Sequence, residues 1–108
     1  MPNAPVHHVV TLNYGSPFSA NPQRIQVKPG DTISFRLGTG PANGRVKVTF
    51  KASDQARFST RVFNGGDPDV RVNANVVPTT YHCELLVNGT VVAESQEVGG
   101  EIEPAPSN

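Results

Sequence analysis

The stretch Arg24-Ile-Gln-Val-Lys-Pro-Gly-Asp-Thr-Ile-Ser-Phe-Arg-Leu37 decides the fold, because it holds two alternating strands joined by a short turn. Over 24–28 and 32–37, apolar residues alternate with polar ones, which is the period of a strand with one buried face. Pro29 presets φ for the first central turn position, and Gly30 accepts the positive φ that a type II turn requires next. This stretch predicts β structure and carries no chemistry of its own.

Composition narrows the fold class and the partners. The chain has 108 residues, which predicts a single domain over 1–108 with loose ends at 1–5 and 104–108. Nine basic and nine acidic residues give a formal charge of zero, so we expect neither nucleic acid nor a membrane surface as a partner. Ten glycines and ten prolines favour short strands joined by turns. No apolar run reaches the roughly 20 residues that span a bilayer.

The rest of the chain adds further short strands. Asn88-Gly89 predicts a two-residue hairpin with a type I′ turn, in which Leu85 pairs with Val92 and Leu86 with Val91. Other strands are expected over 6–14, over 45–51, once or twice near 70–77, and near 98–102. The sum is about seven or eight strands, which predicts a Greek-key β-sandwich, with a small barrel as the alternative.

Three connections are predicted to form the working surfaces, namely loops 15–23, 38–44 and 64–69. In the last of these, Asp67 and Asp69 are expected to accept hydrogen bonds from nearby backbone amides. A calcium site there is the alternative, but the loop lacks the ligand spacing of an EF-hand.

The N-terminal residues have no basic segment followed by an apolar one, so no secretory signal is recognised. We therefore expect a cytoplasmic protein, or a periplasmic one if a leader was removed. The single cysteine, Cys83, excludes an internal disulfide.

Two motifs together resemble the cupredoxin family. The first is Ile25-Gln-Val-Lys-Pro-Gly-Asp-Thr-Ile-Ser-Phe35, which is similar to the V-x-P-G-D-T-V-x-F strand pair of that family. The second is Tyr81-His82-Cys83, which is similar to the Y-x-C that precedes the family's copper loop. The resemblance implies a cupredoxin-like sandwich over most of the chain.

The resemblance does not extend to the copper ligands. Cys83 matches the family's cysteine, but the residues after it are Glu84-Leu-Leu-Val-Asn88, where the family has a histidine followed by methionine or glutamine. The region 35–50, where the family has its other histidine, contains none, and Met1 is the only methionine. A blue-copper site needs two imidazoles and one thiolate, so no cofactor is expected.

A rebuilt metal site is the rival hypothesis. It would hold copper or zinc with Cys83 and either His82 or His8, and would make the chain a metal-binding or electron-transfer protein. Because His82 and Cys83 are neighbours on a strand, they should point to opposite faces.

No catalytic residues are predicted. A cysteine nucleophile needs a neighbouring base, and the only candidate, His82, should face away from Cys83. No Gly-x-Ser-x-Gly or His-Glu-x-x-His motif is present. We therefore expect a non-enzymatic binding module for an unidentified protein or small molecule, without copper.

Overall fold

The computed structural model describes residues 4–15, 18–73, 77–96 and 98–106, and its regular structure is almost entirely β. These described residues form ten strands, where we expected seven or eight. They are β1 (His7–Asn13), β2 (Ser19–Asn21), β3 (Arg24–Val27), β4 (Thr32–Thr39), β5 (Gly44–Phe50), β6 (Val62–Asn64), β7 (Val70–Arg71), β8 (Thr79–Val87), β9 (Thr90–Glu94) and β10 (Gly100–Pro104). The strands that were not expected are the three-residue β2 and β6, which are too short to show a period in sequence, whereas β7 lies in the stretch near 70–77 where one or two strands were expected.

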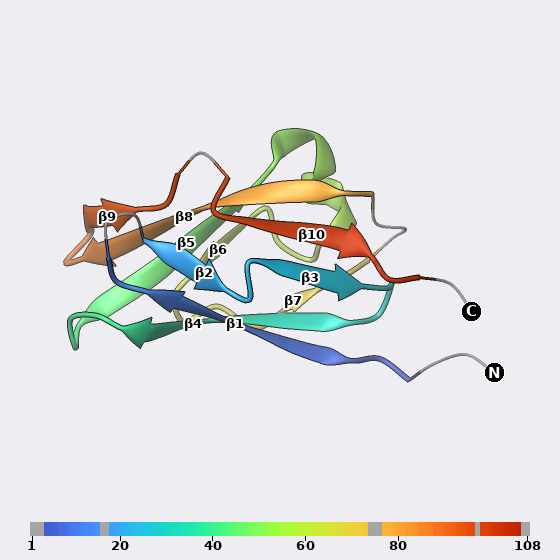
Figure 1. Cartoon of the computed structure of the whole chain (residues 1–108), viewed down its shortest axis with the longest axis horizontal. Helices are drawn as coiled ribbons and strands as arrows, with labels where there is room; N and C mark the ends of the chain where they lie inside the picture. The colour runs from blue at the N-terminus through green and yellow to red at the C-terminus, as the bar shows by residue number, and fades with distance from the viewer. Residues whose placement is uncertain (1–3, 16–17, 74–76, 97, 107–108) are drawn as a thin grey trace.

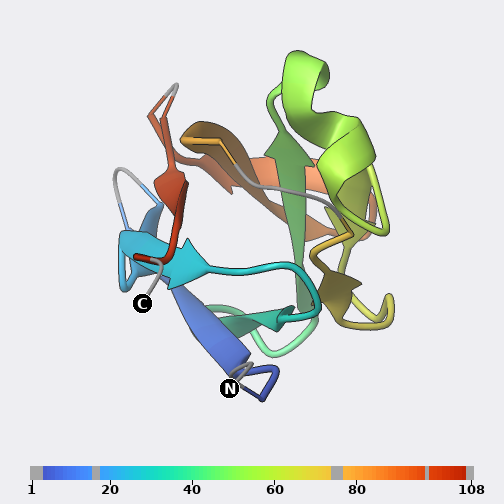
Figure 2. The ribbon, with the colours of Figure 1, turned by 90° about the vertical axis from the view of Figure 1, so that its right-hand side faces the viewer.

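The strands form two open sheets, an architecture consistent with a β-sandwich. One sheet has the order β2-β1-β4-β7, and the other has the order β3-β10-β8-β5-β6, with β9 paired to β8 (Figure 1). Both sheets are mixed, because β1 runs parallel to β4 and β3 runs parallel to β10. A six-residue 3₁₀ helix, Ala52–Arg57, stands at the rim of the sheets in Figure 2. Within the described residues, no helix has the length and apolar character to cross a membrane.

The turn at Pro29-Gly30 forms as predicted, but it joins different sheets. The Asp31 amide donates to the Lys28 carbonyl at 3.0 Å, and Gly30 has φ +93°. β3 pairs with β10, whereas β4 pairs with β1 and β7. The turn therefore carries the chain across the core from one sheet to the other, which lets the inward faces of both strands bury apolar side chains.

The aromatic side chains form the centre of the core. Phe35 of β4 contacts the rings of Phe50, Phe63 and Tyr81 with centroid distances of 5.4–6.0 Å. Phe50 also stacks on Phe58 at 4.6 Å, which fastens the segment after the 3₁₀ helix to β5. Each ring is at most 5% exposed, so these contacts fill the space between the sheets.

The hairpin turn is confirmed, while its register is partly wrong. Asn88 has φ +52° and Gly89 has φ +80°, as a type I′ turn requires. Leu86 pairs with Val91 as predicted, but Leu85 pairs with Ala93. An extra residue in β9 forms a bulge between these pairs, and a turn motif alone does not reveal a bulge.

Two other expectations at the chain's connections need correction. Residues 19–21, predicted as part of a loop, form β2 and pair with β1. Pro104 and Ala105, predicted as part of a loose tail, are attached to β3: Pro104 pairs with Val27, and the Ala105 amide donates to the Val27 carbonyl at 2.8 Å.

Candidate functional site

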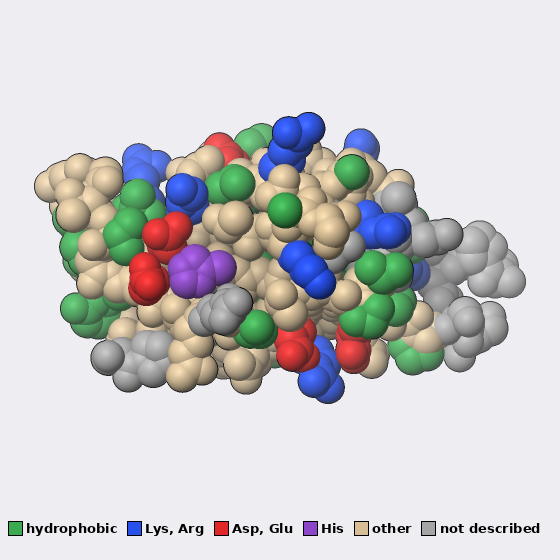
Figure 3. All heavy atoms as spheres, turned by 90° about the horizontal axis from the view of Figure 1, so that it is seen from above, with side chains coloured by type: hydrophobic (Ala, Val, Ile, Leu, Met, Phe, Trp, Pro, Cys, Tyr) green, Lys and Arg blue, Asp and Glu red, His purple; other side chains and the backbone are tan. Residues whose placement is uncertain are grey.

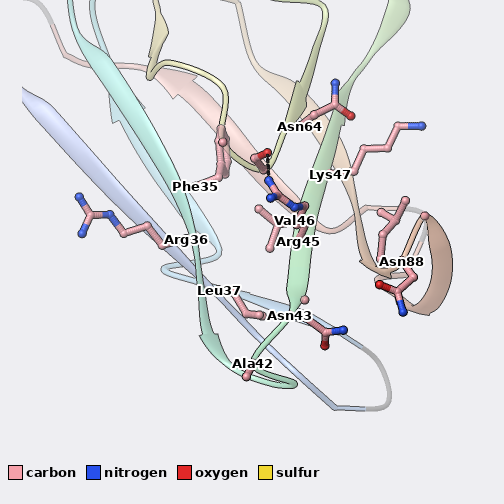
Figure 4. A pocket seen from close by; sticks show the side chains of 15 residues that line it. Phe35, Arg36, Leu37, Ala42, Asn43, Arg45, Val46, Lys47, Asn64 and Asn88 are labelled. Carbon is pink, nitrogen blue, oxygen red and sulfur yellow. Dashed lines mark hydrogen bonds between the residues drawn. The ribbon is translucent and has the colours of Figure 1, made fainter.

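A surface groove of about 710 Å³ opens where β4, β5 and two connections meet (Figure 4). Two of the three predicted loops contribute to its wall, through Ala42, Asn43 and residues 64–66. The hairpin turn 88–89 supplies another part of the wall, although the sequence identified it only as a turn. The described residues of loop 15–23, which are 15 and 18–23, do not line the groove.

The groove combines an apolar base with donor groups. Phe35, Leu37 and Val46 supply apolar surface, whereas the cations Arg36, Arg45 and Lys47 and the carboxamides Asn43, Asn64 and Asn88 supply hydrogen-bonding groups. No aspartate, glutamate, histidine, serine or cysteine is among the described residues that line it. The groove is therefore basic, although the whole chain is neutral, and its described lining offers no hydroxyl, thiol, imidazole or carboxylate group.

Arg45 occupies the middle of the groove. Figure 4 shows its guanidinium beside the segment after β6, while Arg36 and Lys47 extend outward on opposite sides. The Arg45 Nη1 donates to the Gly65 carbonyl at 3.1 Å. One donor is used there, and a guanidinium has five, so Arg45 is oriented and still has donors for a ligand.

Backbone hydrogen bonds hold the wall at 64–67. The Gly65 amide donates to the Val46 carbonyl at 2.7 Å, which ties the loop to β5. Gly66 has φ +97°, a conformation that favours glycine. The Asp67 carboxylate accepts the Asn64 amide at 2.8 Å, as the sequence predicts for this turn.

The residues of the rival metal hypothesis lie in three different environments. Cys83 is fully buried in the core. His82 is half-buried on the opposite face of β8, where its Nδ1 lies 3.2 Å from both the Ser95 hydroxyl and the Gln96 carbonyl. His8 is in the other sheet and donates its Nε2 proton to Asp31 at 2.9 Å. Within the described residues, the only group of potential ligands found together is His82, Glu84 and Glu94, which includes neither Cys83 nor His8.

The Cys83 thiol is predicted to be unreactive in the folded protein. Burial raises the pKa of Cys83 to about 12, so the thiol stays protonated at neutral pH, and the thiolate is the reactive form. We expect labelling by a thiol-reactive disulfide at pH 8 to be at least about 100-fold slower than in the urea-unfolded chain. Labelling at equal rates in the two states would show an accessible thiol and reopen the cysteine-enzyme class.

Asp31 forms a buried junction that sequence reasoning missed. It is 1% exposed, and its carboxylate accepts hydrogen bonds from the Val6 amide, the Lys28 amide, the Lys28 ammonium and His8, all at 2.8–3.1 Å. Burial alone would raise the pKa of Asp31, but the bonds from His8, Val6 and Lys28 together hold it well below its usual range. These bonds join β1 to the turn before β4, which is a structural role.

A second missed cluster crosses the outer face of the first sheet. Ser34 donates to Asp69 at 2.7 Å and lies 3.1 Å from the His7 Nε2, while the His7 Nδ1 lies 2.7 Å from the Thr32 hydroxyl. Asp69 therefore binds a side chain of β4 and not a nearby amide, contrary to the prediction. The Ser34 proton points to the carboxylate and not to an imidazole base, so the arrangement does not activate Ser34 as a nucleophile.

Comparisons of the sequence and the structure with known proteins identified no related protein. A scan of protein-family models, a search of curated proteins and a search of solved structures each found no significant match to this chain.

Proposed function

We propose that this chain is a cupredoxin-like, Greek-key β-sandwich without a copper site, and that it serves as a non-catalytic binding module for an anionic ligand. The observation that carries the proposal is the groove around Arg45, whose described lining combines three cations and three carboxamides with apolar side chains and contains no carboxylate. Such a surface suits carboxylate groups on a small molecule or on an acidic peptide segment. Arg45 would supply paired donors, and Lys47 a point charge.

Three features support the proposal against enzymatic and copper functions. The described lining of the groove has no hydroxyl, thiol, imidazole or carboxylate group that could serve as a nucleophile or general base. Cys83 is buried, and its raised pKa disfavours the thiolate that copper requires. His8 is in the other sheet and already bonded to Asp31.

The test is titration of the ¹⁵N-labelled chain with a short glutamate peptide and, separately, with citrate. We expect saturable shifts of amides along the groove, and Arg45→Gln should weaken binding about tenfold, because a hydrogen bond to a charged group contributes about 1.5–3 kcal/mol. Arg61→Gln is the matched control, since Arg61 is an exposed arginine that does not line the groove.

Equal affinities of the two arginine variants would contradict the proposal, as would equal binding of a glutamine peptide. Binding of citrate but not of the peptide would identify a small-molecule site, and the reverse would identify a peptide site.

A further inference from the structure

Three potential metal ligands lie together on the solvent face of β8 and β9, away from Cys83. His82, Glu84 and Glu94 each offer one ligand atom, and these atoms are all within 4.8 Å of one another. Figure 3 shows a histidine beside acidic side chains on this face of the molecule. The residues come from adjacent strands, so the backbone of a sheet, and not a loop, sets their spacing.

The β-bulge in β9 is what places Glu94 in this group. With the regular register expected from the hairpin turn, Ala93 would lie opposite Glu84. The extra residue between the Leu86–Val91 and Leu85–Ala93 pairs shifts the strand by one position, so that Glu94 lies opposite Glu84. Bulges often re-aim a side chain at a functional site.

Hydrogen bonds outside the group fix the ring of His82. The Ser95 hydroxyl donates to the Gln96 carbonyl at 2.8 Å, so toward His82 both oxygens can only accept. The His82 Nδ1, 3.2 Å from each of them, must therefore carry the proton. In the neutral ring this leaves the lone pair on Nε2. A proton held on one nitrogen by a carbonyl is the usual support of a metal-binding histidine.

Among the described residues, no lysine, arginine or histidine forms an ion pair with either carboxylate. Glu84 and Glu94 lie directly opposite each other, and like charges in that position destabilise a sheet. Lys47 lies across from Glu84 on β5, but the described residues contain no ion pair to either glutamate. A bound cation would remove this repulsion and use the free acceptors.

We propose that His82, through Nε2, and the carboxylates of Glu84 and Glu94 form a Zn²⁺ site with at least one open position. One imidazole and two carboxylates are all ligands that Zn²⁺ takes, whereas Ca²⁺ and Mg²⁺ prefer oxygen ligands alone. Zinc ligands lie about 2.0–2.2 Å from the ion. The three side chains must therefore draw together, and rotation of the two glutamates on the open face permits it.

The test is a titration of the ¹⁵N-labelled chain with ZnCl₂ alone. We expect one-to-one saturable binding, a large shift of the His82 Nε2 signal, and a higher melting temperature with zinc. His82→Gln should weaken binding at least about tenfold, and Glu84→Gln and Glu94→Gln should each weaken it clearly. In the metal-free protein, each glutamate variant should melt no lower than the parent chain, because the repulsion is removed.

Matched controls separate this site from others. His7→Gln and Glu103→Gln change an exposed histidine and a glutamate elsewhere, and Cys83→Ala removes the thiol of the rival hypothesis; all three should leave zinc affinity unchanged. The proposal would be overturned if His82→Gln bound zinc as tightly as the parent chain, or if Cys83→Ala lost zinc binding. It would also be overturned if the parent chain bound Ca²⁺ as tightly as Zn²⁺, or if the titration did not saturate. If a variant does not fold, the zinc-induced shift of the His82 Nε2 signal in the parent chain tests the proposal, and the absence of that shift would overturn it.

Discussion

Replacing Asp31 with asparagine is expected to lower the free energy of unfolding by about 3 kcal/mol at pH 7, the lower end of the cost of breaking a buried ion pair. All four neighbouring groups of the Asp31 carboxylate are donors: two backbone amides, the Lys28 ammonium and the His8 imidazole. A carboxylate accepts all of them, but the amide group of asparagine would turn an N–H toward at least one donor. The lower end applies because the side chains of Lys28 and His8 are 26% and 17% exposed. Urea unfolding of both proteins measures the difference.

The same junction predicts how stability depends on pH. Because the folded-state pKa of Asp31 lies well below the unfolded value of about 3.9, its contribution is complete above about pH 5 and is lost as the pH falls toward the folded pKa. The difference between Asp31→Asn and the parent chain should therefore shrink between pH 5 and pH 2. Asp67→Asn is the control, since Asp67 is exposed and, among the described residues, its carboxylate accepts only the Asn64 amide of its own turn. A deficit for Asp31→Asn no larger than that of Asp67→Asn, or one that is constant with pH, would show that the junction does not stabilise the fold.

Local motifs were predictable from the sequence, and pairings between distant strands were not. Pro29-Gly30 and Asn88-Gly89 each determine a turn through the φ values of two adjacent residues, and both turns have the predicted geometry. By contrast, the Asp31 junction depends on the parallel pairing of β1 with β4, which brings together residues more than 20 positions apart. No local pattern shows which strand will lie beside β4.

The same holds for the candidate sites: their local parts were predictable from the sequence, and the contacts between distant strands were not. Loops 38–44 and 64–69 were predicted as working surfaces because they connect strands, and both reach the groove. The order of the sheets, which the sequence does not show, determines that residues 88–89 line the groove and that the described residues of 15–23 do not. Glu94 could not be linked with His82 and Glu84, because one extra residue in β9 determines which side chain lies opposite Glu84. The metal hypothesis included Cys83 because Tyr81-His82-Cys83 is similar to a cupredoxin motif, but the Cys83 side chain is buried in the core.

Truncating Phe50 to alanine is expected to be the most destabilising single change in the core, at about 4 kcal/mol. Phe50 is 1% exposed and contacts the rings of Phe35, Phe58 and Tyr81, which belong to β4, to the segment after the 3₁₀ helix and to β8. Its removal therefore leaves a cavity bordered by both sheets, which cannot close without moving a strand. Urea unfolding followed by circular dichroism measures the loss.

Two further variants test whether the lost free energy of unfolding comes from the packing of the Phe50 ring. Val91, which is 44% exposed on β9, is the control, and Val91→Ala should change stability by less than about 0.5 kcal/mol. Phe50→Leu should recover part of the loss, because it refills most of the volume without the ring contacts, which add about 0.5–1.5 kcal/mol per pair beyond burial. If Phe50→Ala cost no more than Val91→Ala, the aromatic cluster would not be the centre of the core. If Phe50→Leu matched the parent chain, volume alone, and not the stacked and tilted rings, would hold the 3₁₀ segment against β5.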